Sequence, residues 1–206
     1  MNLSRKGMME LLGSEWIVLN PYRDITGVWT IGAGHTGDVG GKEIGRLDEL
    51  SLVQCMTLFK TTVQQYEKGV EEAFSVTLSQ SEFDAAVSFH YNTGAISRAE
   101  WVAHVNNGNR ERAECSSDSG IMAWRRPKQI IARRERERDL FFHGTYSGTG
   151  RISVFKANTQ GEILWNSRKI VKEEDLFGNP VVTPAVPMFT DAQIRFITKT
   201  MQEART

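Results

Sequence analysis

A long amphipathic segment, residues 52–74, constrains the fold more than any other part of the chain. Its apolar residues recur at intervals of three and four, which keeps their side chains on one face of an α-helix for about six turns. They are Leu52, Met56, Phe59, Val63, Tyr66, Val70 and Phe74. A helix of this length exceeds what one small lobe needs, so we expect it to link two lobes.

The chain before this helix combines a short helix with a small sheet. Residues 4–12 place three apolar side chains on one side of a helix that Gly13 is expected to close. In residues 17–35, strand-favouring side chains are followed by closely spaced glycines, a pattern that favours a β-hairpin over a helix.

Residues 75–144 are predicted to be helical. Ser79 and Glu82 have the spacing of a capping box, which predicts a helix that starts there and ends at Gly94. Further helices are expected at residues 101–105, 110–115 and 127–142, the last one stopped by Gly144. The first 144 residues therefore predict an α+β fold that is mostly α, with one small sheet.

The composition is that of an ordinary globular protein. The 206 residues include 25 acidic and 25 basic side chains, so no long-range cationic field for nucleic acid is expected. Cys55 and Cys115 have no metal-ligand spacing, and we expect two inert thiols, no disulfide framework, no metal and no cofactor. Residues 1–12 lack a secretory h-region of the usual length, so we expect synthesis in the cytoplasm without an export signal.

Basic side chains gather in residues 125–138, where seven of them stand against two glutamates. They are Arg125, Arg126, Lys128, Arg133, Arg134, Arg136 and Arg138. Most are expected to lie on a solvated helix and to pair with acids one turn away. A nucleic-acid footprint is the alternative, but no aromatic residues are interleaved with the run and the chain is neutral.

Glu15 is the first candidate for acid–base chemistry. It follows the first predicted helix, where the negative end of the helix dipole disfavours an ionised carboxylate. Trp16 and Ile17 flank it and are expected to shield it from water, which also favours the neutral form. Glu15 is therefore predicted to be a proton donor.

Asp24 is the second candidate, at the end of the first strand of the hairpin. Gly27 stands where a three-residue loop needs a left-handed residue, and this register pairs Tyr22 with Thr30. Asp24 and Thr30 are then diagonal neighbours about 7–8 Å apart, a gap that one water bridges. Inverting glycosidases combine such a carboxylate with a proton donor about 6.5–9.5 Å away. Spacing alone does not establish a catalytic pair, because Glu15 and Asp24 could also be two solvent-exposed acids without a role in catalysis.

The run from Glu15 to His35 resembles the active-site signature of the phage-type lysozymes, the muramidase endolysins of glycoside hydrolase family 24. Eight residues separate Glu15 from Asp24, five separate Asp24 from Thr30, and Ile31-Gly32-Ala33-Gly34-His35 follows. Residues 78–94 and 124–141 resemble the opening and the closing helix of the family's second lobe. The similarity covers about residues 3–144.

The resemblance implies a two-lobed lysozyme-like fold that hydrolyses the β-1,4 bond between N-acetylmuramic acid and N-acetylglucosamine in peptidoglycan. By position, Glu15 is the general acid, Asp24 activates water and Thr30 helps to hold that water. The residues carried over as substrate-binding are Tyr22, Asn92 and Arg133.

Three positions bear on family features outside the catalytic motif. His35 matches a family histidine that is usually structural. The acid that pairs with it in relatives appears here as Thr62, which predicts no ion pair. Ala99 and Glu100 stand where relatives often have Ser-Thr, so the sugar contacts of that lobe are expected to differ.

The resemblance also divides the chain. Residues 1–144 form the expected catalytic domain, with a first lobe to about residue 50, a linking helix at about 51–74 and a second lobe at 75–144. Residues 145–206 form an extension with a possible hairpin around residues 158–161, a proline-rich linker and a final helix near Thr190. A wall-binding element, a packed extension and a contact to another phage component remain open for it. We expect it to be unnecessary for the chemistry.

The expected partners are peptidoglycan and a holin-type membrane pore that releases a monomeric enzyme from the host cytoplasm. Two alternatives remain at this point. One is a catalytically weak or inactive scaffold that binds peptidoglycan, and the other is a lysozyme carried in the virion. Presence of Glu15, Asp24 and Thr30 together favours an active enzyme.

Overall fold

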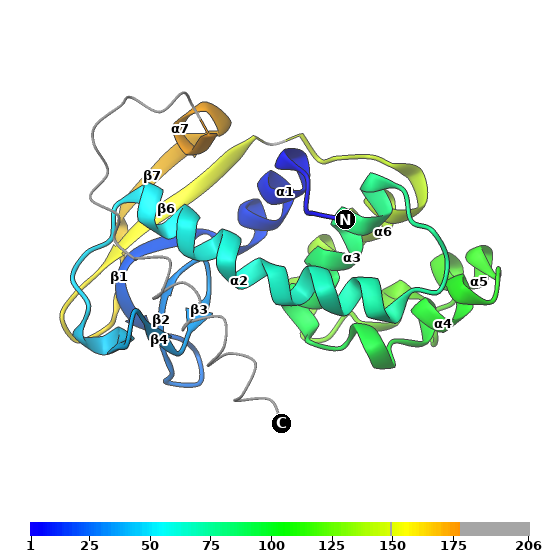
Figure 1. Ribbon diagram of the computed structural model, residues 1–206, viewed down its shortest axis with the longest axis horizontal. Helices are drawn as coiled ribbons and strands as arrows, with labels where there is room; N and C mark the ends of the chain where they lie inside the picture. The colour runs from blue at the N-terminus through cyan, green and yellow to red at the C-terminus, as the bar shows by residue number, and fades with distance from the viewer. Residues whose placement is uncertain (149, 178–206) are drawn as a thin grey trace. The chain divides into compact units, whose positions relative to one another are not determined.

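The computed structural model describes residues 1–148 and 150–177, in two compact units. The helical unit comprises residues 1–14 and 63–148, and the sheet unit comprises residues 15–62 and 150–177. Helix α2, Leu52–Ala73, begins in the sheet unit and ends in the helical unit, as the long apolar repeat predicts (Figure 1). The expected linker with Pro180, Pro184 and Pro187 and the helix near Thr190 lie outside the described residues.

The helical unit packs around Trp101, whose side chain is fully buried. Phe74, Phe89 and Phe141 surround it, with ring centroids 5.7, 5.2 and 5.0 Å from its own. The helices are α1 (Arg5–Glu15), α3 (Gln80–Thr93), α4 (Glu100–Asn106), α5 (Arg110–Cys115) and α6 (Ile131–His143). One-turn 3₁₀ helices lie at Ile96–Arg98, Ile121–Ala123 and Lys128–Ile130.

Local signals set the ends of two of these helices. The predicted capping box forms at the start of α3, with the Ser79 and Glu82 side chains each accepting from the other residue's backbone N–H. Gly94 and Gly144 end α3 and α6 in the left-handed conformation. Helix α1 differs from expectation, because it runs through Gly13 and ends at Glu15. A single glycine inside a helix costs only about 1 kcal/mol relative to alanine, which packing offsets.

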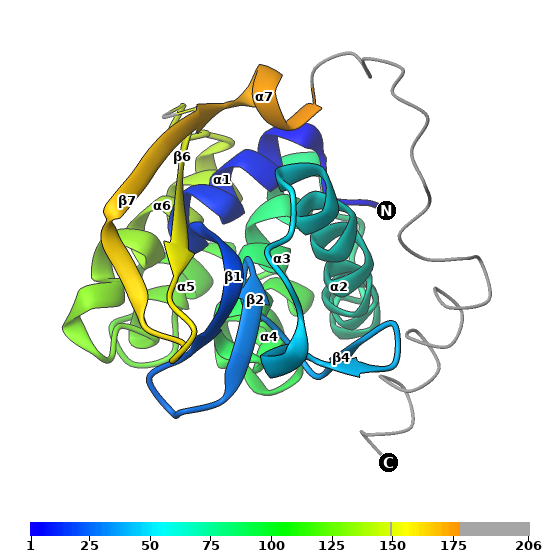
Figure 2. The same cartoon turned by 90° about the vertical axis from the view of Figure 1, so that its left-hand side faces the viewer.

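The sheet unit contains a five-stranded sheet in the order β3-β2-β1-β6-β7. Figure 2 shows β2, β1, β6 and β7 of this sheet side by side. Strands β1 and β6 are parallel, and the other neighbours are antiparallel. The strands are β1 (Ile17–Arg23), β2 (Trp29–Gly32), β3 (His35–Thr36), β6 (Arg151–Ala157) and β7 (Ile163–Lys172). A second sheet pairs β4 (Asp38–Val39) with β5 (Lys42–Glu43), followed by a 3₁₀ turn (Ile44–Arg46), and α7 (Glu173–Phe177) follows β7.

The C-terminal extension differs from the expected division at residue 144. Strand β6 pairs with β1, so residues 151–172 belong to the sheet that carries the N-terminal hairpin. Val18 and Tyr22 of β1 form one hydrophobic cluster with Phe155 and Ala157 of β6. Of the three alternatives for this extension, its described part shows a packed one.

The short stretch before β6 is also held in place. The Tyr146 hydroxyl donates to Asp84 Oδ2 at 2.8 Å, and the Ser147 hydroxyl donates to Glu10 Oε2 at 2.7 Å. These bonds attach the start of the extension to α3 and α1 of the helical unit. None of the helices in residues 1–148 and 150–177 has the length and apolarity needed to span a membrane.

His35 forms a buried hydrogen bond with Thr62 of α2. Its Nδ1 lies 2.8 Å from Thr62 Oγ1, and the Thr62 hydroxyl donates to the Leu58 carbonyl at 2.9 Å. The hydroxyl has one proton, so it accepts from the His35 N–H. Burial lowers the pKa of His35, which favours the neutral ring. The position is therefore structural, as the resemblance implies.

Replacing Thr62 with valine is expected to lower the free energy of unfolding by about 1–3 kcal/mol, since the buried His35 N–H loses its acceptor. Thr61→Val is the matched control, because the Thr61 hydroxyl bonds the Thr57 carbonyl on the exposed side of the same helix. Urea denaturation measures both variants. Equal losses would show that the bond between His35 and Thr62 adds no stability.

Candidate active site

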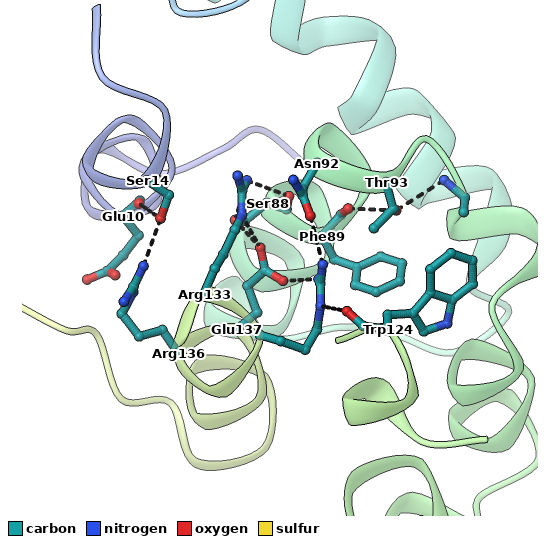
Figure 3. Close-up of polar contacts among 12 residues, drawn as sticks. Glu10, Ser14, Ser88, Phe89, Asn92, Thr93, Trp124, Arg133, Arg136 and Glu137 are labelled. Atoms are coloured by element: carbon teal, nitrogen blue, oxygen red, sulfur yellow. Dashed lines mark hydrogen bonds and ion pairs between the residues drawn. The ribbon is translucent and has the colours of Figure 1, made fainter. Parts of the chain in front are cut away.

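Glu15 is the last residue of α1, and its neighbourhood is tightly held. Trp16 adopts the left-handed conformation with φ of 47°, which is costly for a residue with a side chain and turns the chain from α1 into β1. On the α1 side, Arg136 Nη2 donates to Ser14 Oγ at 3.2 Å (Figure 3). The Glu15 side chain is half-buried. The position is therefore fixed from both sides of the residue.

The hairpin that carries Asp24 has the predicted register. Tyr22 pairs with Thr30 and Arg23 pairs with Trp29. The Asp24 N–H donates to the Val28 carbonyl at 3.0 Å, and Gly27 occupies the left-handed region with φ of 82°. The three-residue loop and its glycine are confirmed, because both follow from local sequence chemistry.

The Asp24 carboxylate is anchored by its own loop. Oδ1 accepts from the Thr26 hydroxyl at 2.7 Å, from the Thr26 N–H at 2.8 Å and from the Val28 N–H at 2.9 Å. These bonds, with that of the Thr26 hydroxyl the strongest, lower the pKa of Asp24 below its ordinary value. All three bonds fall on Oδ1, so this carboxylate is ionised and oriented at neutral pH.

Thr30 is buried on β2, directly across from Tyr22. Its hydroxyl donates to the Val28 carbonyl at 3.1 Å. With its only proton engaged, the hydroxyl oxygen offers lone pairs to any further partner. The Thr30 hydroxyl oxygen is therefore suited to accept a hydrogen bond from a water molecule.

Tyr22 lies close enough to both Glu15 and Asp24 to interact with their charges. Burial, together with the smaller effects of the nearby Glu15 and Asp24 charges, raises the pKa of its phenol to about 12. The phenol therefore keeps its proton and remains a hydrogen-bond donor. Its ring packs in the cluster with Phe155 and Ala157, which is a structural role alongside the predicted contact with substrate.

Asn92 and Arg133, the other predicted substrate-binding residues, lie in the helical unit, where Arg133 is buried and Asn92 is exposed (Figure 3). Arg133 donates to Glu137 Oε1 at 2.9 Å and to the Ser88 carbonyl at 3.1 Å. Asn92 Oδ1 accepts from Arg134 at 2.8 Å. These contacts fix both side chains, and their assignment to substrate binding stays a prediction.

The basic run at residues 125–138 is only partly exposed to solvent. Arg133 and Arg134 are buried and share Glu137, whereas Arg125, Arg126 and Lys128 are exposed. The expected pairing one turn along the helix is present between Arg133 and Glu137. Burial of the two arginines could not be read from the run, because it depends on packing against α3.

Contacts between the hairpin and the C-terminal strands were missed by the sequence reasoning. Trp16 packs against Phe155 and Trp165, and the N–H of Arg23 donates to the Gly161 carbonyl at 2.8 Å. A packed extension was one of three open alternatives, and nothing in the sequence pointed to these partners.

The remaining candidate groups are the side chains that could bind a metal ion and the buried Cys55 thiol. No group of three or more His, Cys, Asp or Glu side chains in residues 1–148 and 150–177 is placed to hold a metal ion. Burial raises the pKa of the Cys55 thiol to about 12, which keeps it protonated.

Comparison with known proteins identifies the family of this chain. Residues 13–137 match the family described as phage lysozyme. The chain belongs to the phage lysozyme family. Among its relatives, the endolysin of Salmonella phage P22 is 29% identical over 68% of this chain and 98% of its own length. The endolysin of Bacillus phage B103 is 28% identical over 84% of this chain and 69% of its own length.

The fold of this phage lysozyme family member also matches solved structures. The endolysin of Escherichia coli O157:H7 phage FAHEc1 superposes with a TM-score of 0.62 at 27% identity, and the match covers 71% of this chain and 96% of that one. The protein is a lysozyme-type hydrolase of the α+β class that lyses peptidoglycan.

Proposed function

We propose that this lysozyme hydrolyses the β-1,4 bond between N-acetylmuramic acid and N-acetylglucosamine with inversion at the anomeric carbon. The observation that carries the proposal is the hairpin register, which puts Thr30 across from Tyr22 and the anchored Asp24 carboxylate at the adjoining turn. Glu15 enters the same environment through its charge interaction with Tyr22.

Glu15 acts as the general acid. In glycoside hydrolysis, a carboxylic acid protonates the glycosidic oxygen as the bond to the anomeric carbon breaks. A rigidly held acid contributes most, because the proton must be aligned with the leaving oxygen in the transition state. The fixed turn at Ser14 and Trp16 supports this role.

Asp24 and Thr30 hold the attacking water. Oδ1 of Asp24 is engaged by the loop, which leaves Oδ2 to accept a proton from water. The Thr30 oxygen accepts the second water hydrogen, since its own proton is donated to the Val28 carbonyl. The water lone pair is then directed at the anomeric carbon, and Asp24 serves as the general base.

This geometry predicts that the first product is the α anomer, because a water between enzyme and sugar attacks opposite the leaving group. Proton NMR of a short muropeptide digest, recorded before mutarotation, distinguishes the anomers. An initial β product would contradict the role of Asp24 as a base and indicate direct attack on the sugar.

The proposal extends to host lysis. Relatives named endolysin support a role in lysis of the host. We propose that the protein is a monomer that accumulates in the host cytoplasm and reaches the wall through a holin-type pore. Cells that express the chain alone are expected to grow normally and to lyse once chloroform opens the inner membrane. Lysis without membrane damage would contradict this order of events.

A further inference from the structure

The hairpin formed by β6 and β7 contacts the catalytic region at two separate places. One contact is at the aromatic ring of Trp16, next to Glu15. The other is at the turn between the two strands, residues 158–161, which lies against the hairpin of Asp24. Parallel pairing of β6 with β1, Ile17 with Val154 and Val18 with Phe155, fixes the register between these contacts.

At the first contact, the partly exposed Trp16 packs against two aromatic rings of the extension. Its ring centroid lies 5.7 Å from that of Phe155 and 5.5 Å from that of Trp165, both in edge-to-face geometry. Phe155 and Trp165 also pack on one another at 5.4 Å. These ring contacts stabilise the left-handed conformation of Trp16. Because Glu15 is the last residue of α1 and precedes Trp16, they also stabilise the orientation of Glu15.

At the second contact, Gly161 lies directly on Trp29. A Cβ at Gly161 would stand 2.7 Å from the Trp29 ring, so only glycine permits this approach. The Arg23 guanidinium covers the Trp29 ring at 4.3 Å from its centroid and donates to the Gly27 carbonyl at 2.7 Å. Gly27 belongs to the loop that orients Asp24. Gly161 is therefore connected to that loop through the side chains of Trp29 and Arg23.

We propose that the hairpin of β6 and β7 is a positioning element of the active site, which orients Glu15 through Trp16 and Asp24 through Trp29 and Arg23. Trp165 and Gly161 are its two positioning residues. Neither belongs to the 13–137 range that matches the family. The proposal replaces the expectation that residues 145–206 are unnecessary for the chemistry, and it rests on the roles of Glu15 and Asp24 given above.

The first test replaces Trp165 with alanine in the full chain. Trp165 is 61% exposed, so its loss should leave no large cavity. We expect kcat on a soluble muropeptide to fall about tenfold, with KM changed less than twofold, because a misaligned acid slows chemistry more than binding. Trp165→Phe should restore most of kcat. Ile170→Ala is the matched control, since Ile170 is an exposed apolar residue of the same strand, 48% exposed.

The second test replaces Gly161 with alanine. Gly37→Ala is its control, because both glycines have positive φ, 85° and 95°, whereas no atom lies within 4 Å of a Cβ at Gly37. The backbone cost is therefore shared, and only the Gly161 variant displaces Trp29. We expect kcat to fall at least fivefold for Gly161→Ala and less than twofold for Gly37→Ala.

Equal kcat values for variants and controls, or a Trp165→Phe variant as slow as Trp165→Ala, would overturn the positioning role. That outcome is separable from failure of the proposed function. If Glu15→Gln abolishes cleavage while Trp165→Ala is as fast as Ile170→Ala, only the role of the hairpin falls. If Glu15→Gln keeps full activity, the assignment of the acid falls.

Discussion

Replacing Glu15 with glutamine is expected to lower peptidoglycan turnover by a factor of about 10² to 10⁴, the range of a lost general acid. Glutamine keeps the shape of the side chain and its place at the end of α1, but it carries no proton for the leaving oxygen. A turbidity assay on purified sacculi and a zymogram measure the loss. Circular dichroism should show an unchanged fold.

Glu43→Gln is the control for this variant. Glu43 is an exposed residue of the same unit and pairs with Arg46, so its neutralisation should leave turnover unchanged within twofold. Full clearing by Glu15→Gln would remove Glu15 from the mechanism. Absence of clearing by the wild type itself would favour a scaffold that binds peptidoglycan without cleaving it.

The parts of the fold that the sequence predicts well are those with local causes. Helix α2 follows from apolar spacing, the start of α3 from the Ser79 and Glu82 pair, and the end of α6 from Gly144. The register of the Asp24 hairpin likewise follows from Gly27 and strand alternation. Each of these features depends on residues within a few positions of one another.

Features that depend on distant partners escaped prediction. Parallel pairing of β6 with β1 joins segments that are far apart in the chain, and no pattern in residues 151–157 identifies Ile17 and Val18 as its neighbours. The extension of α1 past Gly13 has a similar cause, since Arg136 of α6 bonds Ser14. Gly13 favours the end of a helix, but tertiary contacts of the following residues extend α1 to Glu15.

The candidate site divides in the same way. Asp24, Thr30 and Tyr22 are brought together by one hairpin, so their geometry was accessible from spacing. Arg133 and Asn92 were assigned only through resemblance. The buried bond of Arg133 to Glu137 and the partly buried bond of Asn92 to Arg134 arise where α3 packs on α6. A basic run in a sequence does not reveal which of its arginines will be buried.

Glu137 is the acid on which this buried network depends. It forms ion pairs with both Arg133 and Arg134, and its own side chain also accepts from the Ser88 hydroxyl at 2.7 Å. Arg134 is 0% exposed and Glu137 is 3% exposed. Burial lowers the pKa of Arg134, and the charge of Glu137 opposes this effect. One carboxylate thus forms ion pairs with two guanidinium groups that have little access to water.

Glu137→Gln is therefore expected to lower the free energy of unfolding by about 3–5 kcal/mol, the cost of leaving a buried charge without its partner. Glutamine preserves the volume, so the loss reports charge and not a cavity. Glu135→Gln, an exposed glutamate of the same helix, should change stability by less than about 0.5 kcal/mol. Urea denaturation of the two variants gives the comparison.

Kinetics of the same variant test whether Arg133 also contacts substrate. The Arg133 guanidinium keeps its bond to the Ser88 carbonyl when Glu137 is neutralised, but it loses the charge that aligns it. If Arg133 binds the glycan or its peptide, KM should rise severalfold at a temperature where the variant is folded. A destabilised variant with unchanged KM would assign Arg133 to the packing of α3 on α6 alone. A loss of stability equal to that of Glu135→Gln would show that the carbonyls of Ser88 and Trp124 compensate the arginines without Glu137.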